Sequence, residues 1–237
     1  MFIPSVKLVE YLCYALLLQI EKGSEEISWE GNFFHAKVVY MVKLLLVRHA
    51  ESVNNVDKGI ARRAWSNFKS TCSLPSCSEW RTIGHLLTFP MDSDVSPEGL
   101  KMIEVQRRRL QEHGILEKYN VRLIIHSHLK RARKTCEGLF SPLPMQVHSG
   151  IFEKDIAETL GINSIQTRVN AFVESVLAQP ADATIVVLGH SAFFRCLLST
   201  DVHMENCEVR LCELSEIDGT ILRNDLVLEG GRKVCCC

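Results

Sequence analysis

The fold is decided by the stretch Leu44-Leu45-Leu46-Val47-Arg48-His49-Ala50-Glu51-Ser52. Its first four residues form a short apolar run, which predicts a buried strand. Burial accounts for these apolar side chains, but it gives no reason for a guanidinium and an imidazole to follow them directly. In α/β proteins, ligands bind outside the carboxyl ends of the strands. The pair Arg48 and His49 is therefore typical of a nucleophile beside a group that binds phosphate.

Three further segments place polar side chains beside apolar runs. The run 121–125 leads to Ser127-His128-Leu129-Lys130-Arg131-Ala132-Arg133-Lys134-Thr135. The run 186–188 leads to Gly189-His190-Ser191. Between these two lies the acidic segment Ile151-Phe152-Glu153-Lys154-Asp155-Ile156-Ala157-Glu158-Thr159-Leu160-Gly161. Because each segment follows or adjoins a separate strand, we expect their side chains to converge at one edge of a sheet.

Taken in order, the four segments resemble the histidine phosphatase superfamily, the phosphoglycerate-mutase-like enzymes. The signature of that family is Arg-His-Gly/Ala-Glu-Ser with an asparagine six residues after the histidine, the position that Asn55 holds here. The other segments are similar to Ser-x-Leu-x-Arg-Ala-x-Gln-Thr, Leu-x-Glu-x-Asp-x-Gly-Glu-x-x-Gly and Ser/Thr-His-Gly. The joint match covers roughly residues 42–200. Its departures are Lys134, Ala157, Gly189 and Ser191, which bear on substrate preference more than on catalysis.

The resemblance implies a set of site residues, three catalytic and four phosphate-binding: His49, Glu153 and His190, and Arg48, Arg131, Asn55 and Ser191. Their chemistry fits together. Planar arginine side chains neutralise a phosphate with paired hydrogen bonds. A histidine that is neutral at one nitrogen can attack phosphorus and become a phosphohistidine. Glu153 would protonate the leaving group and then activate water, and Asp155 is the alternative acid.

Composition and periodicity predict one α/β domain. The chain has 237 residues, of which 46% are hydrophobic and 23% charged, which is enough for one buried core. Strands are expected at about 42–47, 121–126, 145–148, 183–188, 207–214 and 219–228, and helices at about 97–113 and 163–177. The predicted fold is a three-layer α/β/α sandwich with a mostly parallel central sheet of about six strands.

This domain is expected to span residues 41–230, between two other segments. Residues 1–40 match nothing in the family, and their apolar stretch 11–20 is too short to cross a bilayer. We interpret them as an optional extension or an artefact of the assigned start codon, with a short amphipathic anchor helix as the alternative. Residues 231–237 form a cysteine-rich tail. Within the domain, the irregular stretch 56–95 is interpreted as a lid whose Lys58, Arg62, Arg63 and Arg81 meet the substrate; a solvated insertion is the alternative.

Several other kinds of site are disfavoured. His126 and His128 lack further ligands at metal spacing, so no metal and no cofactor is expected. The basic stretches 107–109 and 130–134 have no interleaved aromatic residues, and the net charge is only −1, so no nucleic-acid partner is expected. The sequence also lacks the glycine-rich loop of P-loop enzymes.

Cysteine usage bears on the compartment. The ten cysteines form no disulfide framework, and Cys136, Cys196 and Cys212 lie in apolar runs, which indicates reduced core residues and a cytoplasmic protein. At the end of the chain, Cys235, Cys236 and Cys237 follow two basic residues, an arrangement in which acylation would give a weak membrane association.

The function predicted from these features is a metal-independent phosphomonoesterase of the histidine acid phosphatase type, which acts through a phosphohistidine on a small phosphorylated substrate or a phosphoprotein. A phosphoglycerate-type mutase is the alternative. It is disfavoured because the mutases of the family have a longer insertion between the glutamate and the second histidine, and only 36 residues separate Glu153 from His190 here. A non-catalytic phosphate-binding scaffold is a third interpretation, against which the intact His49 and Glu153 argue.

Overall fold

The computed structural model describes residues 25–30, 33–38, 41–87, 92–179, 184–201 and 203–231. Near the amino terminus, β1 (Glu25–Glu30) pairs antiparallel with β2 (Phe33–Val38), a hairpin that the sequence did not predict. The segments for which an anchor helix and an acylated tail were considered, 11–20 and 235–237, lie outside the described residues.

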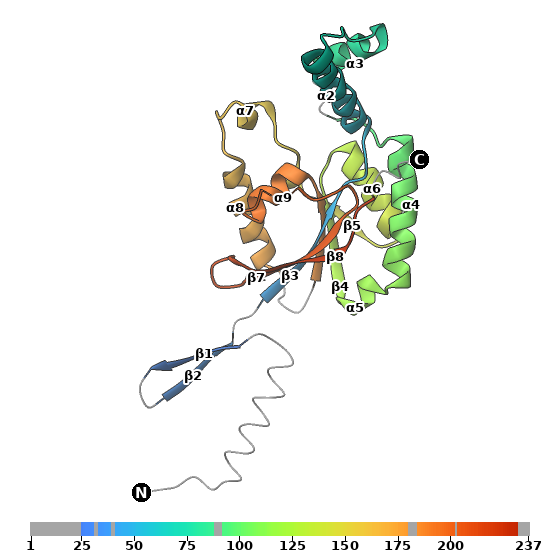
Figure 1. The fold of residues 1–237 in the computed structure, drawn as a ribbon. Helices are drawn as coiled ribbons and strands as arrows, with labels where there is room; N and C mark the ends of the chain where they lie inside the picture. Colours follow the sequence, from blue (N-terminus) through green and yellow to red (C-terminus); the bar gives the residue numbers. More distant parts are fainter. Residues whose placement is uncertain are drawn as a thin grey trace, which may run out of the picture.

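A six-stranded sheet forms the centre of the described domain (Figure 1). Its strands are β3 (Met41–Arg48), β4 (Val121–His126), β5 (Met145–Val147), β6 (Thr184–Gly189), β7 (Val209–Ser215) and β8 (Ile221–Leu228). The order is β5-β4-β6-β3-β7-β8; the first four strands run parallel, whereas β7 and β8 add antiparallel pairs. The predicted sheet is therefore confirmed, and the predicted strands lie within a few residues of the observed ones.

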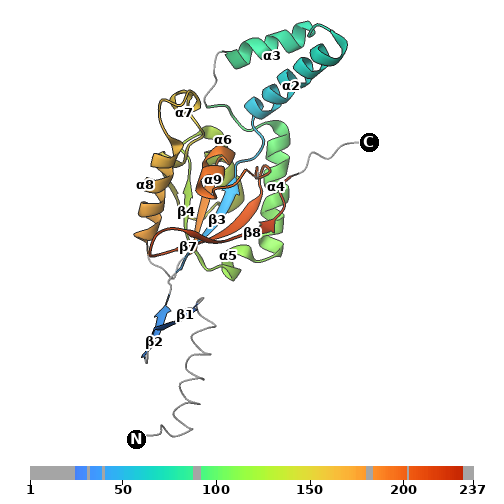
Figure 2. The ribbon, with the colours of Figure 1, turned by 60° about the vertical axis from the view of Figure 1, so that its left-hand side comes forward.

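Helices cover both faces of this sheet (Figure 2). One face holds α4 (Pro97–Glu112), α5 (Ile115–Lys118) and α6 (Lys130–Phe140), and the other holds α8 (Ile165–Leu177) and α9 (Ser191–Leu197). Alternation along β3 produces the two cores, because Leu45 and Val47 pack with the first group of helices while Leu44 and Leu46 pack with the second. The predicted three-layer α/β/α sandwich is thus confirmed.

The α4 layer packs closely against the segment that follows β3. Ser96 caps α4 by accepting a hydrogen bond from the Gly99 amide, with Pro97 in the first turn. A Cβ atom at Gly99 would lie 2.2 Å from the carbonyl oxygen of Glu51, so only glycine lets α4 approach this closely. The Oγ atom of Ser96 also donates to the Glu51 carboxylate at 3.0 Å, which fixes the chain just after His49.

The stretch predicted to be irregular, 56–95, instead contains two helices. These helices, α2 (Val53–Thr71) and α3 (Cys77–Leu87), form a hairpin that projects from the carboxyl edge of the sheet (Figures 1 and 2). Ala64 is the one buried residue of α2, and no described residue of α3 is buried. Apolar residues do recur at helical spacing in α2, at Val53, Val56, Ile60, Ala64 and Phe68, so the prediction of an irregular stretch was wrong. The short elements η1 (Ser149–Ile151) and α7 (Ile156–Thr159) complete the fold.

No helix within the described ranges is long and apolar enough to cross a membrane. Cys136 and Cys212 are buried, as predicted, and so is Cys207, whereas Cys196 is only partly buried. Burial raises the pKa of the Cys136, Cys207 and Cys212 thiols to about 12. These thiols therefore act as small apolar side chains rather than as nucleophiles.

Candidate active site

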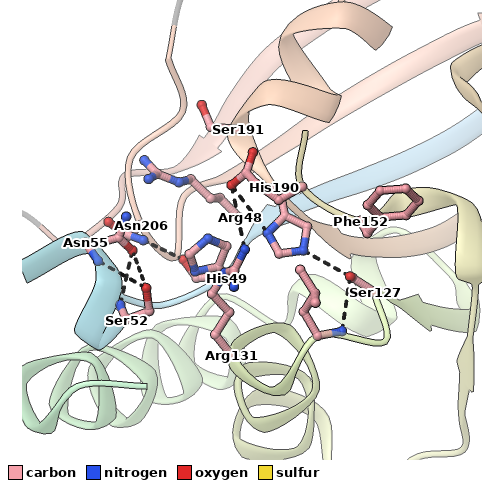
Figure 3. A network of polar contacts seen from close by, with 12 residues as sticks. Arg48, His49, Ser52, Asn55, Ser127, Arg131, Phe152, His190, Ser191 and Asn206 are labelled. Carbon is pink, nitrogen blue, oxygen red and sulfur yellow. Dashed lines mark hydrogen bonds and ion pairs between the residues drawn. The ribbon is translucent and has the colours of Figure 1, made fainter. Parts of the chain in front are cut away.

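The two candidate histidines meet where β3 and β6 end side by side (Figure 3). Arg48 pairs with Gly189 in the parallel register, and the His49 amide donates to the Gly189 carbonyl oxygen at 3.1 Å. This register leaves the His49 and His190 rings with centroids 4.9 Å apart. Both side chains are buried, with exposed fractions of 1% and 0%.

His49 is held as a neutral imidazole. Its Nδ1–H donates to the carbonyl oxygen of Ala50 at 2.6 Å, which leaves Nε2 with its lone pair. Burial holds the pKa of His49 well below its ordinary value, and the charges of Arg131 and Arg48 lower it further. The Asn206 side chain donates to the His49 carbonyl oxygen at 2.7 Å and so fixes the backbone at this position. A neutral, immobilised imidazole with one free lone pair is suited to nucleophilic attack.

His190 is oriented by Ser127. The Nε2 atom of His190 lies 3.0 Å from Ser127 Oγ, which also accepts a hydrogen bond from the Leu129 amide at 3.3 Å. Burial lowers the pKa of His190 well below its ordinary value, and His49 and the arginines act in the same direction. The buried Nδ1 atom of His190 makes no hydrogen bond to any described residue. When the Ser127 hydroxyl donates to Nε2, Nδ1 carries the hydrogen and is a free donor.

Two arginines supply positive charge beside the histidines. The Nη1 atom of Arg48 donates to the Met204 carbonyl oxygen at 2.5 Å, while its buried Nε makes no hydrogen bond within the described part of the chain. Arg131 is 5% exposed and lies 3.9 Å from Glu153, measured from Nη2 to Oε2. Burial lowers the pKa of both guanidinium groups, and Glu153 opposes this shift. Arginine remains charged even so, and the site therefore attracts anions.

Thr135 ties the two arginine-bearing segments together. Its buried Oγ1 accepts a hydrogen bond from the Ala50 amide at 3.0 Å and donates to the Arg131 carbonyl oxygen at 2.6 Å. One hydroxyl thus joins the segment after β3 to the first turns of α6.

Glu153 lies in the loop between η1 and α7, where it faces His190. Its Oε2 is 3.7 Å from His190 Nδ1, and its side chain is 31% exposed. Arg168 of α8 holds this loop on both sides, because its Nη1 donates to the carbonyl oxygens of Gly150 (2.6 Å) and Phe152 (3.2 Å). Its other nitrogens form a bidentate pair with Glu158, at 2.7 Å each.

Asp155, the alternative acid, has a structural role in the described conformation. Its Oδ1 accepts a hydrogen bond from the Glu158 amide at 2.7 Å, and the Glu158 carboxylate accepts one from the Asp155 amide at 3.1 Å. These reciprocal bonds form a capping box that begins α7. Glu153, which faces the histidines, is therefore the better placed of the two acids.

The remaining predicted site residues, Asn55 and Ser191, lie at helix starts. Asn55 closes a capping box with Ser52, whose amide donates to Asn55 Oδ1 at 3.1 Å (Figure 3). Ser191 forms a hydrogen bond with His203, with 3.0 Å between Ser191 Oγ and His203 Nδ1. Its hydroxyl points away from the rings of His49 and His190 (Figure 3).

The residues present also allow a test of metal binding. His49, Glu153 and His190 each offer one ligand atom within 4.8 Å of the others. Two guanidinium groups flank the same space, and both of them add repulsion toward a cation. The donor set therefore fits an anion better than a divalent metal.

Three residues that matter here were not assigned a role from the sequence. Asn206 belongs to no recognisable motif. Arg168 lies on a helix whose apolar stripe indicates only packing. Ser127 belongs to the second motif and directly follows β4, a position that does signal a function.

Comparison with models of protein families finds no match, and neither does comparison with curated proteins. Solved structures do match. The phosphoglycerate mutase from Bacillus anthracis str. Sterne is 13% identical with a TM-score of 0.52, over 80% of this chain and 93% of that one. The product of a Mycobacterium tuberculosis open reading frame is 16% identical with a TM-score of 0.51, over 80% and 99%. A proposed α-ribazole-5'-P phosphatase from Escherichia coli is 14% identical with a TM-score of 0.50, over 80% and 97%. The chain therefore has the phosphoglycerate-mutase-like α/β fold that its motifs predicted.

Proposed function

We propose that the protein is a phosphomonoesterase that acts through a phosphohistidine at His49. The observation that carries the proposal is a pair of buried nitrogens, Arg48 Nε and His190 Nδ1, which make no hydrogen bond to the described residues. A buried donor without an acceptor costs about 1–3 kcal/mol. Both atoms belong to residues that flank a neutral histidine nucleophile, beside Arg131. A phosphate dianion supplies acceptors and charge that complement all of these groups.

In the first half-reaction, the phosphate binds between the arginines and His190, and His49 Nε2 attacks phosphorus. The phosphorus–nitrogen bond forms as the bond to the ester oxygen breaks, and Glu153 transfers its proton to the departing alkoxide. Such positioned acids contribute typically about 10²–10⁴-fold. The 3.7 Å separation between Glu153 Oε2 and His190 Nδ1 supports this role for the acid.

In the second half-reaction, water attacks the phosphohistidine. Glu153, now a carboxylate, accepts the proton of the water as the oxygen–phosphorus bond forms and the bond to Nε2 breaks. Inorganic phosphate leaves, and His49 regains its lone pair. Splitting one difficult displacement into two easier ones is the purpose of the covalent intermediate.

The low pKa of His190 defines its part in this cycle. In the unliganded site, burial and neighbouring positive charges keep this imidazole neutral, so it meets the substrate as a hydrogen-bond donor. A bound dianion adds opposite charge at short range, which raises the pKa of His190 and favours proton uptake. Substrate binding and protonation of His190 are thus coupled.

A mutase is the second candidate, since the fold is shared with a phosphoglycerate mutase. Mutases must shield the phosphohistidine from water until the acceptor returns. Glu153 is 31% exposed here, which gives water access to the group that would activate it. This exposure supports hydrolysis. Small phosphorylated compounds and phosphoproteins are the substrate classes that we propose.

The test is hydrolysis of p-nitrophenyl phosphate between about pH 5 and 8 in excess EDTA, the range in which histidines ordinarily titrate. Wild-type protein is expected to turn over, His49→Ala to lose activity, and His113→Ala to behave as wild type, because His113 is an exposed residue at the end of α4. Loss of wild-type activity in EDTA would indicate a metal at His49, Glu153 and His190 instead. Equal activity of the wild type and His49→Ala would overturn the assignment.

A further inference from the structure

The tip of the α2–α3 hairpin carries a cluster of large apolar side chains that nothing in the described structure covers. We call Trp65, Phe68, Leu74 and Trp80 the tip cluster; their exposed fractions are 60%, 36%, 77% and 55%. All four lie in the last turns of α2, the connecting loop or the first turn of α3. The rings of Trp65 and Phe68 stack on each other, with their centroids 5.8 Å apart. Grouped exposed apolar side chains of this size mark an interaction site.

Basic residues surround the tip cluster. Segment 53–87 contains five Lys or Arg and only two Asp or Glu, whereas the whole chain has a net charge of −1. Four of these cations, which we call the collar, flank the tip cluster and are exposed: Arg62, Arg63, Lys69 and Arg81. The Lys69 ammonium lies over the Trp65 ring, 5.4 Å from its centroid. Positive charge beside Trp and Leu is the composition of segments that dock on anionic membranes, where Trp occupies the interface and cations meet the headgroups.

The end of the described chain lies at the same edge of the sheet as the base of the hairpin. The Gly231 amide donates to the Asn206 carbonyl oxygen at 2.9 Å, and the Asn206 side chain in turn donates to the His49 carbonyl oxygen. Ser52, three residues after His49, caps α2. The six residues after Gly231 include two cations and three cysteines, and fully extended they reach about 20 Å.

From this arrangement we infer that the hairpin docks the protein on an anionic lipid bilayer, with the tip cluster in the interface and the collar on the headgroups. A second copy of the chain is a poorer occupant, because pairing two tips would bring two collars of like charge together. The basic, cysteine-rich tail provides a second attachment from the same edge, and stable anchoring takes two such signals. The candidate active site then lies at the end of the domain that faces the lipid. This inference does not depend on the phosphatase assignment.

The experiment is cosedimentation of the full-length, unacylated protein with two kinds of vesicle, phosphatidylcholine alone and phosphatidylcholine mixed with phosphatidylserine. We expect binding to the mixed vesicles only, and weaker binding at high salt as the collar is screened. Exchanging the tip residues in a Trp65→Ser, Leu74→Ser, Trp80→Ser variant is expected to lower the partition coefficient about tenfold or more. Neutralising the collar with four Gln substitutions is expected to do the same.

The matched control exchanges three equally exposed apolar residues elsewhere, Leu160, Ile162 and Ile217, for Ser; their exposed fractions are 69%, 72% and 59%. This variant is expected to bind as wild type. Hydrolysis of p-nitrophenyl phosphate without vesicles is expected to be the same in the tip variant, its matched control and wild type, so failure of docking and failure of the proposed function are distinguishable. The inference is overturned if wild type does not sediment with anionic vesicles, if the tip variant binds equally well, or if wild type instead dimerises through the tip in size-exclusion chromatography.

Discussion

The Nε2 atom of His190 lies 3.0 Å from the Oγ atom of Ser127, and both side chains are buried. This contact sets which His190 nitrogen carries the hydrogen that faces the substrate. We therefore expect Ser127→Ala to lower kcat about tenfold, the worth of one buried hydrogen bond, with a smaller change in KM. Steady-state kinetics measure this effect. Ser93→Ala removes another buried hydroxyl, one without a hydrogen-bond partner in the described structure, and is the control. Equal kcat in the two variants would show that Ser127 does not position His190.

Arg168 is expected to act on catalysis through the loop that carries Glu153. Its guanidinium donates to Gly150 and Phe152 on one side of Glu153 and to Glu158 on the other. Because displacement of a reacting group by about 1 Å costs up to about 10²-fold, Arg168→Ala should lower kcat by about 10- to 100-fold for an alkyl phosphate. The loss should be smaller for p-nitrophenyl phosphate, whose leaving group needs little protonation.

If Arg168→Ala lowered activity only by disturbing the fold, and not through the acid Glu153, kcat would fall equally for the alkyl phosphate and for p-nitrophenyl phosphate. Glu153→Gln should show the same dependence on the leaving group as Arg168→Ala. Arg133→Ala is the control, since this arginine is exposed and, in the part of the chain that the structure describes, its ion pair is with Glu137 on the same helix, at 3.7 Å. If Glu153→Gln lost no more activity than Asp155→Asn, the assignment of the acid would be wrong.

Glycine at position 99 is expected to be essential for packing. A Cβ atom there would lie 2.2 Å from the Glu51 carbonyl oxygen and 2.7 Å from Val95 Cγ1, so Gly99→Ala forces α4 away from the segment after β3. Overpacking of this kind costs about 1–3 kcal/mol. Thermal unfolding should show a clear decrease in Tm. Gly84→Ala on α3 is the opposite case, since nothing lies within 4 Å of its Cβ, and it should be neutral or stabilising. A Tm for Gly99→Ala at or above that of wild type would contradict the packing argument.

Neighbouring positive charges should lower the pKa of His49 by amounts that differ from residue to residue. Burial and the positive charges of Arg131, Arg48 and Lys58 all lower it, in that order of effect. His49 should therefore stay neutral as the pH falls through the ordinary histidine value, and it should protonate only well below that value. Arg131→Gln removes a positive charge, so the pKa should rise, and Lys58→Gln should raise it less. NMR titration of the His49 imidazole in the unliganded protein measures each pKa. A larger rise in Lys58→Gln than in Arg131→Gln would contradict the electrostatic account.

The parts of the structure that depend on a regular apolar pattern were predictable from the sequence. Strand β6 is buried at every position, and β3 at most positions, so both appear as short continuous apolar runs. His190 follows the carboxyl end of β6, and Arg48-His49 lies at the carboxyl end of β3. The parallel register brings these two strand ends together. This rule predicted that the segments after these strands would converge, whereas the roles of Arg48, His49, Arg131, Glu153 and His190 were implied by the resemblance to the histidine phosphatase superfamily.

Other parts of the structure were not predicted. In the α2–α3 hairpin the described side chains other than Ala64 are exposed or only partly buried, and the irregular stretch that we predicted was wrong, although Val53, Val56 and Ile60 recur at helical spacing in α2. Asn206 reaches the His49 carbonyl oxygen from 157 residues away, and Arg168 holds the Glu153 loop from a neighbouring helix. Both contacts depend on tertiary packing between segments that share no motif.

The central claim is that His49 becomes phosphorylated during turnover. Rapid mixing of the protein with a ³²P-labelled phosphomonoester, followed by an alkaline quench and peptide mapping, tests it most directly. We expect acid-labile label on the peptide that contains His49, forming and decaying within one turnover, and no label in His49→Ala. Label on another residue, hydrolysis without label, or a phosphohistidine that outlives many turnovers would contradict a phosphatase that acts through His49.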